Sequence, residues 1–205
     1  MRKIFAIGLI LVMVVIGFAA MLNPVASCEC EDVTIEKEGI PVCYFGGLPV
    51  SQWDNDNVPL NTFVTWFLKI EVTNNHDYTI EDVVVKDRLG GELMLMDWDP
   101  DDGDVPPDID PRTITQGSWG YSLHGKTDKV FLEWDVGDIL PYHTATFIIG
   151  IGTDINPGGQ QEYTTPGEYY LNSGATVKWI DPTDGKQYSA SSNRIMITVI
   201  GEEEE

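Results

Sequence analysis

Seven aspartates crowd the segment "DWDPDDGDVPPDID", and such closely spaced carboxylates are the side chains in this chain best suited to holding a hard cation. They are Asp97, Asp99, Asp101, Asp102, Asp104, Asp108 and Asp110. Oxygen ligands at alternate positions suit Ca²⁺, and a twelve-residue calcium loop that starts at Asp97 places acids at its positions 1, 3, 5 and 12. The ligands predicted for a structural Ca²⁺ are therefore Asp97, Asp99, Asp101, Asp104 and Asp108.

The same segment departs from the usual calcium loop in two places. Gly103 comes one residue late for the sharp turn, and Asp108 is shorter than the bidentate glutamate usually found last. A hydrated acidic loop without an ion is the alternative, and both interpretations stay open. The "DNDN" run at residues 54–57 is a weaker candidate for the same role.

No pattern in the sequence is typical of a catalytic site. A Gly-x-Ser-x-Gly elbow, a His-Glu-x-x-His helix and a phosphate-binding glycine loop are all missing. The histidines fall in predicted turns or at strand ends: His76, His124 and His143. We expect a protein that is not an enzyme.

The N-terminal residues predict export. Residues 1–3, Met-Arg-Lys, precede an uncharged run over residues 4–22, which is the layout of a secretory signal. This run approaches the roughly 20 residues that span a bilayer, so an uncleaved anchor helix is an alternative. Val25-Ala26-Ser27-Cys28 resembles a bacterial-type lipobox, which implies lipidation of Cys28 after removal of residues 1–27. Lipoprotein, simple cleavage and anchor all place the remaining chain outside the membrane, on the cell surface or in the envelope.

Cysteine pairing depends on the same choice. If a lipid occupies Cys28, then Cys30 and Cys43 remain to form a disulfide, and closing the loop between them stabilises the fold by about 3 kcal/mol. A Cys28 to Cys43 pair, or three reduced cysteines, are the alternatives. Three cysteines without a nearby histidine make a poor zinc site.

The charge excludes one large class of partners. The chain carries 12 basic and 33 acidic residues, for a formal net charge of −21. Such an acidic protein repels nucleic acid and anionic lipid headgroups, whereas it attracts cations and stays soluble. We therefore expect no nucleic-acid partner.

The elements that position these residues are predicted to be strands, because apolar residues alternate with polar ones along much of the chain. The alternation covers residues 64–72, 83–85, 130–136, 145–151, 171–179 and 195–199, separated by turn-forming residues. No window after residue 30 shows a helical stripe. Short alternating strands predict an all-β, antiparallel two-sheet sandwich of about seven to nine strands.

The six tryptophans divide between two predicted environments. Trp66, Trp134 and Trp179 fall on inward faces and are expected in the core, whereas Trp53, Trp98 and Trp119 fall in loops. Aromatic side chains in loops can form a platform for sugars. A carbohydrate site would draw on Trp53, Trp98, Trp119, Tyr121, Tyr163, Tyr169 and Tyr170.

Three blocks of the sequence resemble a known family. "FLKIEVTNNHDYTIEDVVVKDRL", "LEWDVGDILPYHTATFIIGIGTDI" and "YYLNSGATVKW" are similar, in this order, to the conserved-repeat domain of archaeal and bacterial surface proteins, known as domain of unknown function eleven. The resemblance covers roughly residues 58–200. It implies an immunoglobulin-like sandwich that serves as a stalk, adhesion module or envelope component, and it implies no catalytic residue. The chain differs from the family in having one copy and a long acidic insertion.

Two functions follow from this organisation. In the first, residues 1–27 are a signal or anchor, residues 28–57 a stalk and first strand, residues 58–200 the sandwich and residues 201–205 an acidic tail. The protein is then a surface-tethered structural or adhesion module whose partners are the membrane, other envelope proteins or copies of itself. In the second, it is a filament subunit that donates a strand to its neighbour. The residues predicted for the donated strand are Val33, Thr34, Ile35 and Glu36.

Overall fold

The computed structural model describes residues 32–43, 48–90, 93–96, 114–124, 129–153 and 163–201, and all regular structure in these residues is β. The strands are β1 (Val33–Val42), β2 (Val58–Pro59), β3 (Thr65–Asn74), β4 (Ile80–Arg88), β5 (Leu93–Leu95), β6 (Ser118–His124), β7 (Lys129–Ile139), β8 (Thr144–Thr153), β9 (Gly167–Asn172), β10 (Thr176–Asp181), β11 (Lys186–Ser191) and β12 (Ile195–Ile200). The all-β prediction is confirmed. The predicted number of strands was too low, because β2, β5 and β11 are short or lack a clear apolar alternation and the residues of β6 were interpreted as a loop.

One layer is a four-stranded antiparallel sheet in the order β1-β3-β8-β5. Its two central strands carry the clearest alternation in the sequence, and the register places Leu68 of β3 opposite Ile149 of β8. Both side chains are buried. The period of two therefore set which face of this sheet points to the core.

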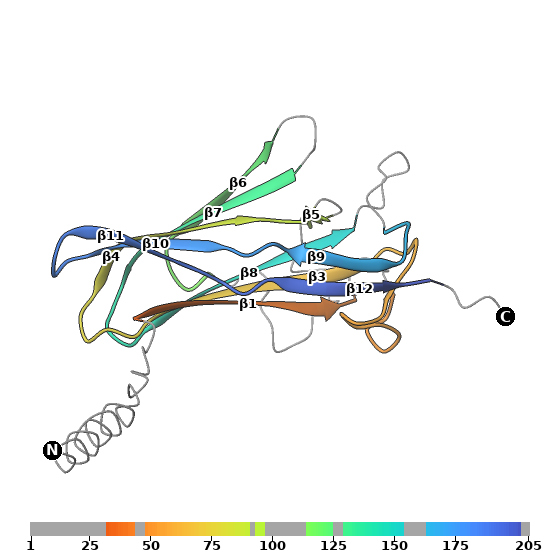
Figure 1. Ribbon diagram of the computed structural model, residues 1–205, viewed down its shortest axis with the longest axis horizontal. Coiled ribbons are helices and arrows are strands. Elements are labelled where there is room, and N and C mark those ends of the chain that lie inside the picture. Colours follow the sequence, from red (N-terminus) through yellow and green to blue (C-terminus); the bar gives the residue numbers. More distant parts are fainter. Residues whose placement is uncertain are drawn as a thin grey trace, which may run out of the picture. The chain divides into compact units, whose positions relative to one another are not determined.

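The second layer is a five-stranded antiparallel sheet in the order β11-β10-β4-β7-β6 (Figure 1). Its inward face meets that of the first sheet, since Trp134 of β7 stacks on Phe147 of β8 with 5.5 Å between ring centroids. Trp66, Trp134 and Trp179 are all buried in the shared core, as predicted. At one end of the layer, β6 and β7 diverge from the body of the sandwich (Figure 1).

A third, three-stranded sheet in the order β2-β12-β9 corrects the prediction of two sheets. The alternation over residues 171–179 predicted one strand, but β9 ends at Asn172 and β10 begins at Thr176. Between them Gly174 has φ of 105°, a conformation that L-residues rarely adopt. The chain changes sheets at this break, so one continuous apolar alternation covers two strands in different sheets.

The predicted signal or anchor helix lies outside the described residues. Among the residues that the structure does describe, no helix has the length and apolar character needed to cross a membrane. The acidic tail at 202–205 also lies outside them.

Candidate functional site

Strand β6 forms an exposed margin of the sandwich, called here the β6 edge (Ser118–His124). It ends the five-stranded sheet and, among the described strands, pairs only with β7. Its large apolar side chains reach solvent: Trp119 is 42% exposed, Tyr121 58% and Leu123 59%. Unpaired backbone groups beside exposed apolar side chains are what a strand from another chain needs for pairing.

The segment before β6 carries the chain from one sheet to the other. Ile114 forms a bridge with Phe147 of β8, and the amide of Thr115 donates to the carbonyl of Thr146 over 3.0 Å. At the next residue the chain has reached β7, where the indole of Trp134 donates to the carbonyl of Gln116 at 3.0 Å. Gly117 turns the backbone between them with φ of 82°.

The two faces of the β6 edge differ in chemistry. On one face the rings of Trp119 and Tyr121 lie 6.3 Å apart with 27° between their planes, and Trp119 leans on Phe147. The other face is polar, since Ser118 and Ser122 lie beside Glu133 and Asp135 of β7. These four residues line an open hollow of 360 Å³ together with Trp119, Gly120 and Tyr121. The edge thus offers aromatic area on one side and carboxylates on the other.

The aromatic residues predicted for a sugar site do not gather in one place. Trp53 is 4% exposed and Tyr163 is 1% exposed, so both belong to the core. Trp53 lies in a loop, as predicted, but its ring is not free to bind a sugar, whereas Trp119 lies in strand β6 and the prediction of a loop there was wrong. Trp53 lies edge-on to Trp66, with 5.1 Å between centroids, and its indole donates to the carbonyl of Leu48. Tyr169 and Tyr170 belong to β9, away from β6 in the pairing order, and Trp98 lies outside the described residues.

The predicted calcium ligands Asp97, Asp99, Asp101, Asp104 and Asp108 lie outside the described residues, as do Cys28 and Cys30. Cys43 follows β1 and is half-buried. In the weaker "DNDN" candidate, Asp54 accepts hydrogen bonds from the Asp56 amide and the Asn57 side chain, which closes a turn. Over the described part of the chain, no three His, Cys, Asp or Glu side chains gather closely enough to hold a metal ion.

The residues predicted for a donated strand complete the protein's own sandwich in this structure. Val33, Thr34, Ile35 and Glu36 lie in β1 and pair with Asn74 to Glu71 of β3. Val33 and Ile35 are buried in the core. Donation of this strand to a neighbour would require it to leave β3 first.

A hydrogen bond to a carboxylate joins the turn between β3 and β4 to the end of β10. The hydroxyl of Tyr78 donates to Oδ2 of Asp181 at 2.7 Å. Desolvation and this bond raise the pKa of Tyr78 to about 12. The same carboxylate accepts from the hydroxyl of Thr183, and these two bonds hold the pKa of Asp181 below its usual range.

A polar cluster inside the core was missed by the sequence analysis. It consists of Lys37 of β1, Asp87 of β4 and Asn172 of β9, here called the core triad, with exposed fractions of 6%, 5% and 0%. Lys37 Nζ lies 3.0 Å from both carboxylate oxygens of Asp87 and contacts Oδ1 of Asn172. Asn172 Nδ2 donates to Asp87 Oδ2 at 2.7 Å. Each residue comes from a different sheet.

A signal for the core triad was present in the alternation. Lys37 continues the inward series of Val33 and Ile35, and Asp87 continues that of Val83 and Val85. Charged residues in inward phase on two strands predict a buried pair, because neither is buried alone. Asn172 could not be assigned this way, since its place follows from the break between β9 and β10.

Comparisons with known proteins identify no family, and no family model matches the chain. An uncharacterized protein of Archaeoglobus fulgidus is 28% identical over 128 residues, which cover 60% of this chain and 39% of that protein. Similar solved structures include the major pilin subunit of Bacillus cereus, at 13% identity, 82% of this chain, 40% of that chain and a TM-score of 0.39. A non-cellulosomal cohesin of Archaeoglobus fulgidus is 10% identical over 82% of this chain and 94% of that chain, with a TM-score of 0.38. Both TM-scores lie below 0.5, so we base no functional assignment on them.

Proposed function

We propose that this protein is a non-catalytic structural and adhesion module of the cell surface, with an immunoglobulin-like sandwich tethered through its N-terminal segment. The secretory pattern of residues 1–22, the net charge of −21 and the resemblance of residues 58–200 to surface-protein repeats support this proposal. The partner is an envelope protein, and it binds the β6 edge as an additional strand.

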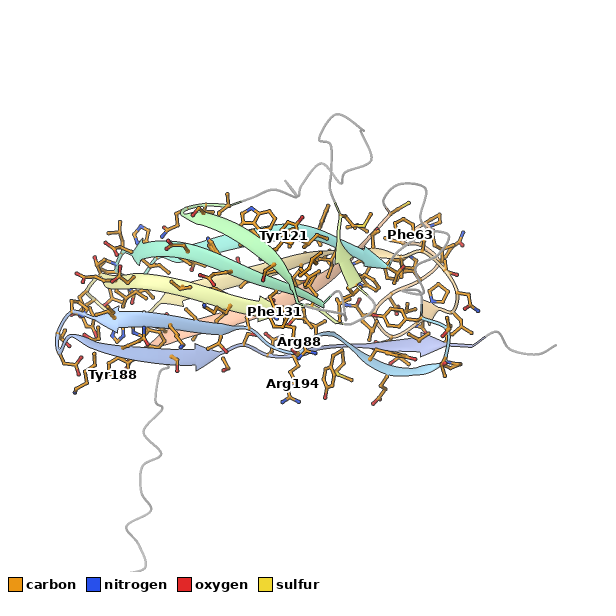
Figure 2. All side chains as sticks on the ribbon, turned by 90° about the horizontal axis from the view of Figure 1, so that it is seen from above. Phe63, Arg88, Tyr121, Phe131, Tyr188 and Arg194 are labelled. Atoms are coloured by element: carbon orange, nitrogen blue, oxygen red, sulfur yellow. The ribbon has the colours of Figure 1, made fainter. Side chains whose placement is uncertain are left out.

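The observation that carries the docking site is the contrast between β6 and the opposite margin of the same sheet. Strand β11 ends that sheet on its other side and is polar: Lys186 pairs with Asp184, and the ring of Tyr188 stacks on Trp179. Charged residues protect an edge strand from pairing. The β6 edge has large apolar side chains and no lysine within Ser118–Leu123. Figure 2 labels Tyr121 and Tyr188 at opposite sides of the sandwich.

Site-specific photocrosslinking tests this assignment. A photoreactive phenylalanine analogue is placed at Tyr121 in one variant and at Tyr188 in a matched control, and each is irradiated on intact cells. We expect a protein adduct from position 121 and none from position 188, because only the first edge binds a strand. Equal adducts at both positions, or a protein adduct at 188 alone, would contradict the proposed docking edge.

The identity of the adduct separates the possible assemblies. A different envelope protein at position 121 supports the adhesion module. A second copy of this chain supports the filament subunit, in which the neighbour pairs with β6. Large particles that disappear when residues 28–40 are deleted would further assign the donated strand to the N-terminal segment.

A carbohydrate ligand is a second candidate, and the nearly parallel rings of Trp119 and Tyr121 favour it. Sugars stack on such aromatic faces. Titration with a glycan panel, followed by tryptophan fluorescence, should then give a saturable change that Trp119→Ala abolishes and Tyr188→Ala retains. A flat response across the panel would remove this candidate.

We also propose that Ca²⁺ is a structural ligand of residues 97–108. A ligand that binds only the folded state raises the unfolding temperature. The melting temperature should therefore be higher in millimolar Ca²⁺ than in excess chelator, and replacement of Asp97 and Asp99 by Asn should remove the difference. An unchanged melting temperature would refute a structural calcium.

A further inference from the structure

The core triad has features beyond those of a buried ion pair. The side chains of Lys37 and Asp87 are 0% and 1% exposed. Burying a lysine and a carboxylate costs several kcal/mol per ion, which good geometry and further hydrogen bonds can offset. Here the third member is an amide whose carbonyl oxygen contacts the amine and whose nitrogen donates to the carboxylate. An amine, a side-chain amide and a carboxylate are therefore in mutual contact.

The amide of Asn172 is oriented for attack. The backbone N–H of Gly174 donates to Oδ1 of Asn172 at 2.9 Å, while Nδ2 faces Asp87. This backbone donor fixes which amide atom is oxygen. It also stabilises negative charge on that oxygen, as an oxyanion hole does when an amine adds to a carbonyl carbon.

Asn193 holds the backbone of Lys37, which carries the amine, in place. The side-chain amide of Asn193 accepts from the Lys37 N–H and donates to the Lys37 carbonyl, both at 2.8 Å. Burial lowers the pKa of the Lys37 amine, although the neighbouring Asp87 opposes this shift. Between two side chains buried this deeply, transfer of one proton from Nζ to the carboxylate removes both charges, and the resulting neutral amine is a nucleophile.

We propose that the core triad forms an intramolecular amide bond between Lys37 Nζ and Asn172 Cγ, with Asp87 as the catalytic proton carrier. Nζ first gives one proton to Asp87 and then adds to Cγ. Asp87 passes a proton to Nδ2 and takes the second proton of Nζ. The Cγ–Nδ2 bond breaks, and ammonia leaves. Asp87 is left protonated, and no oxidant, reductant or external substrate takes part.

The bond would join two strands that do not pair with each other in any sheet. Lys37 lies in β1, a margin of the four-stranded sheet, and Asn172 ends β9 in the three-stranded sheet. Asp87 lies next to both from β4 of the five-stranded sheet. The crosslink is a single self-modification, so it is compatible with a protein that turns over no substrate.

Mass spectrometry of the full chain tests the proposal. After peptide mapping has located the N-terminus, the intact protein should be lighter than its sequence by one ammonia, about 17 Da. A protease digest should contain a branched peptide that joins residues 37 and 172, and trypsin should fail to cleave after Lys37. A wild-type mass equal to the sequence, or the same loss without a branched peptide, would overturn the proposal.

Variants assign the roles. Asp87→Asn keeps both reactants but cannot carry the proton, and Asn172→Leu has no carbonyl carbon to attack, so both should show the full sequence mass. Lys86→Arg is the matched control: this neighbouring lysine is exposed and pairs with Glu133 at 2.9 Å, so the ammonia loss should persist. A branched peptide in Asp87→Asn at the wild-type level would show that Asp87 is not the proton carrier. Because the wild-type measurement needs no variant, a variant that fails to fold leaves the test decisive.

Discussion

The indole of Trp53 fills space in the core beside Trp66 and satisfies its N–H with the Leu48 carbonyl. Replacement of a buried tryptophan by alanine removes apolar contacts and leaves a cavity. We expect Trp53→Ala to lower the free energy of unfolding by about 3–5 kcal/mol. Urea denaturation followed by circular dichroism measures this change.

Tyr121→Ala is the control for Trp53→Ala, because Tyr121 is 58% exposed. Its replacement should lower the free energy of unfolding by less than about 1 kcal/mol. If the two variants were equally stable, Trp53 would not be part of the core. Trp53 would then again be a candidate for binding a sugar.

The hydrogen bond from Tyr78 to Asp181 predicts a dependence of stability on alkaline pH. The pKa of Tyr78 rises from its ordinary 10.0 to about 12 in the folded protein. A group whose pKa is raised on folding contributes stability that is complete below pH 10.0 and is lost as the pH rises through about 12. Ultraviolet titration of tyrosinate should therefore show a late ionisation that Tyr78→Phe reduces; Tyr188, whose pKa is also raised through its hydrogen bond with Asp184, stays in both proteins.

The matched variant for this titration is Tyr142→Phe, since Tyr142 is 70% exposed. It should leave the late ionisation that depends on Tyr78 unchanged. A titration in which Tyr78→Phe changes only the early part would contradict the role of Asp181.

At the scale of elements, Gly117 decides whether β6 can join its sheet. A Cβ at this position would lie 2.0 Å from the carbonyl oxygen of Asp135, and the backbone has φ of 82°. Gly117→Ala must therefore displace the turn that leads into β6. We expect backbone amides of β6 to lose protection from hydrogen exchange while those of β3 keep it.

Gly137→Ala separates backbone strain from collision. Gly137 has φ of 76°, but a Cβ there meets nothing within 4 Å. Its replacement should cost about 1–2 kcal/mol, the cost of a left-handed residue with a Cβ. Gly117→Ala should cost clearly more. Equal effects on stability would mean that the contact with Asp135 relaxes freely.

Strands with regular apolar alternation were predictable from the sequence, including the edge strand β1 and the short β12, whereas β2, β5, β6 and β11 were not. Residues 64–72 and 145–151 gave β3 and β8 with the correct inward faces, because both strands lie in the middle of a sheet and contact the core along their length. Strand β6 was not recognised, although Trp119, Tyr121 and Leu123 alternate with small or polar residues, because Trp119 was interpreted as a loop residue. The break at Gly174 was hidden because both β9 and β10 keep the same apolar period.

The core triad could be anticipated only in part, because the sequence shows its two charged residues but not how the strands meet. Lys37 and Asp87 violate the apolar phase of their strands, which is visible in the sequence. Their pairing depends on which strands meet at the junction of three sheets, and the sequence pattern alone does not determine this junction. Asn172 reaches the pair only because the chain changes sheets after it.

At the scale of the whole molecule, a bond between Lys37 and Asn172 predicts the response to force. A chain pulled by its two ends through this bond bypasses residues 38–171, so they cannot extend. At about 3.4 Å per residue, the unfolded contour of the wild-type protein should be shorter than the full chain by roughly 450 Å. Reducing conditions keep cysteine pairing out of the measurement.

Single-molecule extension of wild type, Asp87→Asn and Asn172→Leu distinguishes the covalent bond from a strong ion pair. An ion pair breaks once force separates its partners, so it leaves the final contour at full length in all three proteins. The covalent bond shortens the contour only in the wild type, and it holds β1 to the end of β9 after the sheets have separated. Full extension of the wild type would therefore remove the crosslink, whereas a shortened wild type beside two fully extended variants would identify the load path of a tethered surface module.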